Sequence, residues 1–163
     1  MIRYHSRIVP LLVDANRIAQ HPGNANLGDV DEIVVSIVKN GCYRPIYATT
    51  DGTILAGHHL YAALLELGAE KVPVIFLDTE DDTDEATRIL LVDNKSARAA
   101  KTDRHAEMDL LKSLDDYTGS GYSESEVVAF IASQEKAESK PLDFGPEGIK
   151  PIPTCDCCGQ ELP

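Results

Sequence analysis

Tryptophan is absent from this sequence of 163 residues, and phenylalanine and methionine are scarce, with three and two copies. Lysine and arginine are also few. They number 15 against 27 aspartates and glutamates, so the formal net charge is −12 at pH 7. Residues 136–163 hold three lysines and five acidic residues, which leaves 12 basic and 22 acidic residues, or −10, in residues 1–135. Nucleic acid is repelled by a body this acidic unless the basic residues cluster.

Long apolar runs are also missing, and no stretch approaches the length that spans a bilayer. The first ten residues, MIRYHSRIVP, lack the apolar centre of a signal peptide. We therefore expect a cytoplasmic protein without membrane contact. Hydrophobic residues still make up 43% of the chain, which is ordinary for a folded domain with a core and an appendage.

Cysteine is concentrated at one end, because three of the four copies lie in the last nine residues. Cys155 and Cys158 form a C-x-x-C pattern followed by Gly159, which has the shape of one zinc knuckle. A tetrahedral zinc ion needs four ligands, so Cys157, a histidine of the body or a second chain has to complete the site. The alternative is a reduced tail that binds no metal.

Periodicity along the rest of the chain predicts alternating strands and helices, followed by helices alone. Expected strands lie within residues 7–15, 44–50, 53–57 and 71–78, and expected helices within 29–41, 57–67, 78–100, 103–117 and 119–135. The dipeptide Asp51-Gly52 predicts a hairpin, and Ser123 with Glu126 predicts a capping box. We expect an α/β core over 1–80, a helical extension packed on it over 81–136, and a linker with the cysteine tail over 137–163.

Six short segments are informative when they are considered together and in their order along the chain. They are HPGNANLGDVDEIVVSIVKNG, YRPI, DGTILAGHHLYAALLELG, VPVIFLD, RILLVDNKSA and GSGY. In this order they resemble the ParB/sulfiredoxin superfamily, most closely the small ParB-like nuclease-domain proteins of actinobacteria and their phages. The resemblance covers about residues 7–133. It implies a small α/β domain with a mixed sheet, a helical extension and, outside the match, the cysteine tail.

Members of this superfamily perform different reactions on a shared fold. ParB proteins bind and hydrolyse CTP while loading onto DNA, sulfiredoxins use ATP to repair an over-oxidised cysteine, and free-serine kinases transfer a phosphoryl group. The resemblance therefore implies a nucleotide, with Mg²⁺, as cofactor or substrate. It leaves nucleotide hydrolysis, phosphoryl transfer and nucleic-acid cleavage open as reactions, because a fold does not select the chemistry.

The central motif is the turn Gly57-His58-His59-Leu60, which follows an apolar strand and opens a helix. Glycine permits close backbone approach to an anion, and the next amides face it. In the family the turn commonly reads Gly, a variable residue, His or Arg, then Arg. Leu60 therefore stands where relatives hold a phosphate-gripping arginine, and His58 where sulfiredoxin has its reactive cysteine. The alternative is that the histidines cap a helix and Leu60 joins an apolar face.

Other candidates surround this turn in the resemblance. Arg44 is a substitute for the missing arginine, or else a solvated surface residue. Asn24 and Asn26 in the loop before the first helix are candidates to hydrogen-bond a base or sugar, or simply form turns. Asn94 and Lys95 match the subfamily.

Carboxylates and basic residues give two further readings. Glu32 and Asp78 lie nearest the expected pocket in the family pattern, and we take Glu32, with His58 and His59, as the catalytic candidates. Arg88, Lys95 and Arg98 share one helical side and form the single basic cluster, either a phosphate footprint or a basic helix end. The acidic run DTEDDTDE is read as a solvated helix start rather than a metal loop.

The function that follows is binding of nucleotide or phosphate at the Gly57-His58-His59 turn, with action on a nucleotide or nucleic acid. The alternative is a catalytically inactive ParB-like adaptor that binds a protein or DNA partner and dimerises through a zinc knuckle. The charge predicts that DNA binding is weak. The metal candidates are Cys155, Cys157 and Cys158.

Overall fold

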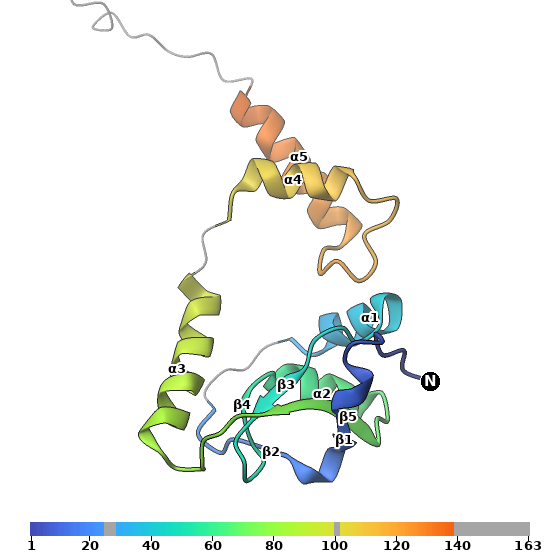
Figure 1. The fold of residues 1–163 in the computed structure, drawn as a ribbon. Helices are drawn as coiled ribbons and strands as arrows, with labels where there is room; N and C mark the ends of the chain where they lie inside the picture. Colours follow the sequence, from blue (N-terminus) through green and yellow to red (C-terminus); the bar gives the residue numbers. More distant parts are fainter. Residues whose placement is uncertain (25–28, 100–101, 139–163) are drawn as a thin grey trace, which may run out of the picture. The chain divides into compact units, whose positions relative to one another are not determined.

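The computed structural model describes residues 1–24, 29–99 and 102–138 (Figure 1). The chain divides into two units, Met1–Val128 and Ala129–Pro163. The boundaries that the sequence predicts at residues 80 and 136 stay predictions. Among the helices of the described ranges, none is long and apolar enough to cross a bilayer.

A five-stranded mixed sheet forms the centre of the first unit. In spatial order its strands are β1 (Leu12–Asp14), β5 (Lys71–Phe76), β3 (Ile46–Ala48), β4 (Thr53–Ala56) and β2 (Ala19–Gln20). Strand β5 pairs antiparallel with β1 and parallel with β3. Strand β4 pairs antiparallel with β3 and parallel with β2. The predicted α/β fold with a mixed sheet is confirmed.

The predicted hairpin around Asp51-Gly52 is present and joins β3 to β4. Gly52 has φ +104°, and a Cβ built there lies 2.4 Å from the Arg17 carbonyl oxygen. The turn closes through the Gly52 N–H, which donates to the Thr49 carbonyl over 3.1 Å. A glycine is required here for both conformation and space.

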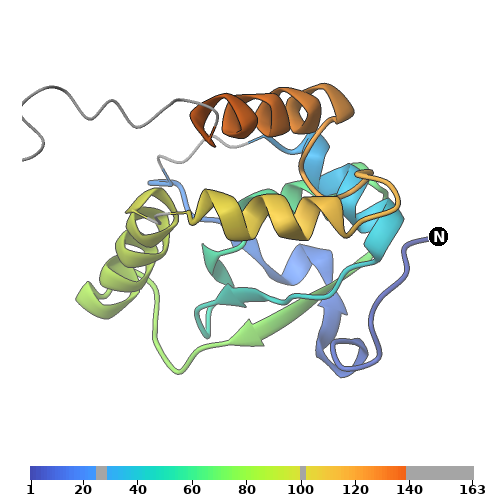
Figure 2. The same ribbon diagram turned by 90° about the horizontal axis from the view of Figure 1, so that it is seen from above.

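Two helices, α1 (Asp31–Asn40) and α2 (His58–Glu66), lie side by side in both views, and α2 also contacts β3 (Figures 1 and 2). Helix α3 (Asp84–Ala99) instead packs against β4. The main core between the sheet and α1 and α2 includes Ile37, Ile46, Ile54, Leu60, Ala63, Leu64, Val72 and Val74. Leu55, Ala86 and Leu90 form a second cluster where α3 meets β4. Both α1 and α2 agree with the sequence prediction.

The predicted first strand is shorter than the apolar run that suggested it. Residues Val9–Leu11 form a 3-10 turn, and the strand covers only Leu12–Asp14. Pro10 lies at the start of that turn, where its fixed φ and missing N–H suit a helical turn better than a ladder. Strand β2 was not predicted, because two residues carry too little periodicity to be recognised.

The third helix begins later than its acidic run suggested, at Asp84 rather than Asp78. The side chain of Asp81 accepts hydrogen bonds from Thr49 and from Thr53, the latter over 2.6 Å. Asp82 follows with φ 56°, so the chain cannot be helical there. Thr83 then accepts from the Ala86 N–H over 3.1 Å and caps the helix. Residues 78–83 of the run are therefore a loop anchored to the hairpin, whereas Asp84 and Glu85 form the first turn of α3, so the predicted helix start is confirmed for the last two residues of the run and wrong for the first six.

Helices α4 (Arg104–Lys112) and α5 (Glu124–Glu138) follow in the extension. Asp103 caps α4 by accepting from the backbone N–H of His105 over 3.0 Å. The predicted capping box at the start of α5 is confirmed. The Glu126 N–H donates to the Ser123 hydroxyl over 3.2 Å, and the Ser123 N–H donates to the Glu126 carboxylate over 2.8 Å.

Candidate nucleotide-binding site

The turn between β4 and α2 leaves backbone donors exposed to a ligand. Gly57 occupies the N-cap position in the left-handed region, with φ 92° and ψ 25°, and no side chain caps the helix there. The Tyr61 N–H donates to the Gly57 carbonyl over 2.9 Å and closes the first turn. A backbone N–H in the first turn of a helix has no acceptor within that helix, which holds for the N–H of His58. This arrangement and the helix dipole favour an anion at the turn.

A pocket of about 530 Å³ opens at this turn, within the volume range of about 300–1,000 Å³ for small-molecule sites. Residues from the loop before α1, from β3, β4, α1, α2 and α3 form its walls. The described lining residues are Asn24, Ile33, Arg44, Pro45, Tyr47, Ala56, Gly57, His58, His59, Leu60, Asp93, Asn94 and Ser96. Six of the predicted binding residues are thus brought together: Asn24, Arg44, Gly57, His58, His59 and Asn94.

His58 is the most informative of these residues, because it is only 6% exposed and its Nε2 has no hydrogen-bond partner among the residues that the structure describes. Burial is the main cause that lowers the pKa of His58, with His21 and His59 adding to the effect, so the neutral form is favoured. Asp93 and a hydrogen bond to the Ile54 backbone act in the opposite direction. A buried polar atom without a partner costs about 1–3 kcal/mol, and such a cost is typical of a site completed by a ligand.

Two asparagine amides come together at the same pocket from segments far apart in the sequence. The Asn94 Nδ2 of α3 donates to the Asn24 Oδ1 over 3.3 Å. The predicted hydrogen-bonding role of these two residues thus has a shared location, whereas Asn26 lies outside the described residues.

Arg44 and Leu60 lie in the wall of the pocket. Arg44 is exposed, lines the pocket, and its side chain makes no hydrogen bond or ion pair to the described residues. Leu60 is 2% exposed and packs in the main core with Ala63 and Leu64. The sequence left open whether Leu60 belongs to a pocket or to an apolar face. It does both, since its buried side chain also borders the cavity.

A second, smaller cavity of about 200 Å³ adjoins this wall, and Glu32 lies there instead of in the main pocket. Ile33, Arg44 and Leu60 line both cavities. The structure therefore does not bring Glu32 into the pocket of His58 and His59. The catalytic role of all three residues stays a prediction.

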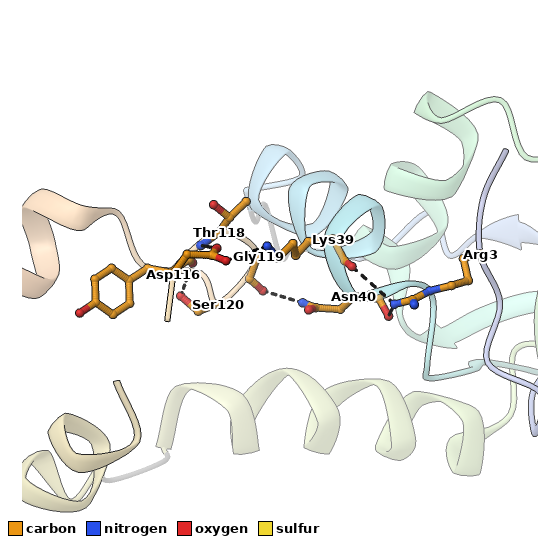
Figure 3. A network of polar contacts seen from close by, with 8 residues as sticks. Arg3, Lys39, Asn40, Asp116, Thr118, Gly119 and Ser120 are labelled. Carbon is orange, nitrogen blue, oxygen red and sulfur yellow. Dashed lines mark hydrogen bonds and ion pairs between the residues drawn. The ribbon is translucent and has the colours of Figure 1, made fainter. Parts of the chain in front are cut away.

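A loop of the extension closes the smaller cavity by binding the end of α1 (Figure 3). Lys39 forms an ion pair with Asp116 at 2.8 Å, and the Asn40 side chain donates to the Gly119 carbonyl over 3.0 Å. The Arg3 guanidinium donates to the carbonyls of Lys39 and Asn40 from the other side. The C-terminal end of α1 thus joins the N-terminal segment to the loop that holds Gly119.

Three other groups of candidates are not among the described lining residues of the main pocket. Lys95 is exposed and absent from the described lining, and Arg88 pairs with Asp84 at 3.0 Å on α3. The side chain of Arg98 and all of Cys155, Cys157 and Cys158 lie outside the described residues. Within the part of the chain that the structure describes, no group of three or more histidine, cysteine or acidic side chains is placed to hold a metal ion.

Sequence reasoning missed three residues with polar side-chain groups that line the pocket: Tyr47, Asp93 and Ser96. The spacing of Asp93 and Ser96 places them on one face of α3, but this gives no sign of what the face meets. Tyr47 pairs with Ala56 across the β3–β4 hairpin, next to the turn at Gly57. Because the hairpin was predicted, its strand register could have placed Tyr47 next to the turn at Gly57.

The comparisons with known proteins rest on structure alone, because no family model and no curated protein matches the chain. The chain is similar to the C-terminally truncated chromosome-partitioning protein ParB from Caulobacter crescentus complexed with CTP-γ-S. The TM-score is 0.61, with 16% identity over 76% of this chain and 77% of that chain.

Two further solved structures have lower scores. ParB from the same organism complexed to the centromeric parS site has a TM-score of 0.42 at 16% identity, over 74% of this chain and 64% of that chain. A free serine kinase in complex with AMP has a TM-score of 0.37 at 24% identity, over 44% of this chain and 32% of that chain. The likeness to the CTP-γ-S complex shows that the chain has a ParB/sulfiredoxin-type fold.

Proposed function

We propose that this protein binds a nucleotide at the N-terminus of α2, with a phosphate group against the turn at Gly57. The observation that carries the proposal is the coincidence of two features in one pocket. The helix N-terminus offers uncapped backbone donors, and the adjoining His58 is buried with an unpartnered Nε2. The ParB of similar fold is complexed with CTP-γ-S, which supports a nucleotide as the ligand.

The lining residues have complementary roles in this proposal. The amides of His58 and His59 and the guanidinium of Arg44 receive the phosphate, because charge-assisted hydrogen bonds are the strongest available there. Asn24 and Asn94 hydrogen-bond the base or the sugar. Lys95 remains a candidate that approaches the ligand only from the exposed face of α3.

A second candidate function is a ParB-like module that binds without catalysis and serves a protein or DNA partner. Leu60 favours it, since an apolar core side chain stands where relatives hold an arginine. The position of Glu32 also favours binding without catalysis, because this catalytic candidate lines the neighbouring cavity instead of the main pocket. DNA binding stays a proposal and is expected to be weak, because Arg88 is already paired and the chain is acidic.

Zinc binding and dimerisation through the tail are separate proposals that rest on the cysteine spacing. They predict at most one zinc ion per chain in the purified protein. Elemental analysis of the wild type and of the double variant Cys155→Ser, Cys158→Ser tests whether these cysteines hold the zinc. Equal zinc content in the two proteins would show that the tail cysteines are not zinc ligands.

The nucleotide proposal is tested by calorimetric titration with nucleoside mono-, di- and triphosphates, each with and without Mg²⁺. A ligand that binds only the folded protein also increases the unfolding free energy, by about 2.7 kcal/mol at a ligand concentration of 100 times Kd. The melting temperature rises as a result. Arg44→Gln is expected to weaken binding about fivefold to tenfold through loss of a charge-assisted contact at an exposed residue.

Arg7→Gln is the matched control, because Arg7 is an exposed arginine that does not line the pocket. It changes the net charge of the protein by the same amount and should leave affinity unchanged. If no nucleotide binds, or if both variants weaken binding equally, the pocket at the α2 turn is not a nucleotide site.

A further inference from the structure

The charge of the pocket limits how much phosphate it accepts. Among the described lining residues the charged side chains are Arg44 and Asp93, and their charges cancel when the histidines are counted as neutral at pH 7. Burial keeps His58 in its neutral form, as the lowered pKa indicates. The backbone dipole at the start of α2 adds about half a charge.

A triphosphate needs more than this pocket provides. Sites for triphosphates neutralise the chain of phosphates with lysine, arginine and Mg²⁺, and the metal is held by carboxylates or hydroxyls. No lysine lines the pocket among the described residues, and Asp93 is the one described carboxylate there. The protein as a whole carries −12, which further disfavours a highly charged anion.

A single phosphate monoester fits this charge better. It carries about −1.5 to −2 at pH 7, so in a pocket where Arg44, Asp93 and the dipole of α2 sum to about half a positive charge it leaves much less uncompensated negative charge than a triphosphate does. The rest of the pocket suits a nucleoside, since Tyr47 offers an aromatic face and the Asn24–Asn94 pair offers amide groups. The volume of about 530 Å³ leaves space for both parts.

We propose that the ligand class of this pocket is a nucleoside monophosphate, selected over di- and triphosphates by the near-zero charge of Arg44 together with Asp93. This proposal rests on the nucleotide-binding function proposed above. It also implies binding independent of Mg²⁺, in contrast to the nucleotide with Mg²⁺ that the family resemblance suggests.

Isothermal titration of the full chain at fixed ionic strength tests the selection with AMP, CMP, their di- and triphosphates, inorganic phosphate and a 5′-phosphorylated single-stranded oligonucleotide. At least one monophosphate should bind as tightly as its triphosphate or more tightly, with no change on adding Mg²⁺. Inorganic phosphate and the oligonucleotide should bind more weakly. A triphosphate that binds about tenfold more tightly than its monophosphate, or an oligonucleotide that matches the monophosphate, would overturn the proposal.

Asp93→Asn sharpens the test by removing the negative charge from the lining. Triphosphate affinity should rise about threefold or more relative to monophosphate affinity, because the change favours the more highly charged ligand. Glu85→Gln is the matched control, because it removes an exposed acidic residue of the same helix that does not line the pocket. In this variant the ratio of triphosphate affinity to monophosphate affinity should not change.

The outcomes separate this proposal from the function on which it rests. If a triphosphate binds preferentially, or if Asp93→Asn and Glu85→Gln shift the ratio equally, selection by charge is wrong and nucleotide binding stands. If the folded protein binds none of the nucleotides, the proposed function itself is wrong.

Discussion

The two ends of strand β4 carry polar residues in opposite situations. At its start, the Asp81 carboxylate accepts from the hydroxyls of Thr49 and Thr53, and the Thr49 hydroxyl also accepts from the Thr53 N–H over 3.0 Å. At its end, the helix that begins at His58 has no side-chain cap, and the His58 Nε2 is buried without a partner.

This contrast separates polar residues that hold the fold from those that we propose to contact a ligand. A polar group whose hydrogen bonds are complete gives stability and offers a ligand nothing. An incomplete group costs stability, and proteins keep such groups where function needs them. We therefore expect substitutions at the start of β4 to change stability alone, and substitutions at its end to change binding.

Leu60→Arg is expected to have the largest effect, because it tests whether the relatives' arginine fits this core. Leu60 is 2% exposed, so a buried guanidinium without a partner should destabilise the fold by about 3–5 kcal/mol. Chemical denaturation measures the loss, and Leu60→Met is the control that keeps volume and polarity. An arginine variant as stable as the methionine variant, with tighter nucleotide binding, would show that the pocket retains space for the arginine.

Asp81→Asn should cost about 1–2 kcal/mol of unfolding free energy and leave nucleotide affinity unchanged. The hydrogen bonds from Thr49 and Thr53 lower the pKa of Asp81. Its contribution is therefore fully present above the unfolded pKa of about 3.9 and is lost as the pH falls through the folded value. Asp82→Asn, at the exposed neighbouring acid, serves as control in pH-dependent denaturation. An equal loss in both variants would contradict the anchoring role of Asp81.

His58→Phe should weaken nucleotide binding about tenfold while changing stability at neutral pH by less than about 1 kcal/mol. Because the folded pKa of His58 is lowered, the unfolded state binds the proton more readily. Stability is thus complete above about pH 6.5 and is lost as the pH falls toward the folded value. Melting curves between pH 8 and pH 5 should show a shallower decline for His58→Phe than for the control His105→Gln. Identical declines would mean that His58 is not buried in solution.

Lys39→Ala should have the smallest effect, at most about 0.5 kcal/mol, because its partner Asp116 is about half exposed and surface ion pairs contribute little. Hydrogen exchange should still report faster opening of the loop around Gly119. Nucleotide affinity should not change, since this loop borders the smaller cavity. A loss of nucleotide affinity in this variant would indicate that the two cavities form one binding site.

How much the sequence could predict depended on whether the signals were local. The hairpin at Asp51-Gly52, the apolar spacing of α2 and the capping box at Ser123 each lie within a few residues, and all three were predicted. The start of α3 was misplaced, because Asp81 is held by threonines 28 and 32 residues earlier in the chain.

The candidate site shows the same division. Gly57, His58 and His59 were recognisable as a turn because they are consecutive, and the family resemblance placed Asn24, Arg44 and Asn94 around it. The lining role of Asp93 was not predictable, since it depends on how α3 meets the turn. Burial of Leu60 together with its place at the pocket wall was equally a matter of packing.

An NMR titration of the ¹⁵N-labelled full chain with a nucleoside monophosphate tests the central claim most directly. The claim predicts saturable shifts of the backbone amides of His58 and His59 and of the Asn94 side-chain amide, with the hairpin amide of Thr53 unmoved. Arg44→Gln should need about five to ten times more nucleotide to reach the same shifts, and Arg7→Gln should need the same concentration as the wild type. Shifts that centre on the Thr49–Thr53–Asp81 cluster, or no shifts at millimolar nucleotide, would contradict the assignment of the α2 turn as the binding site.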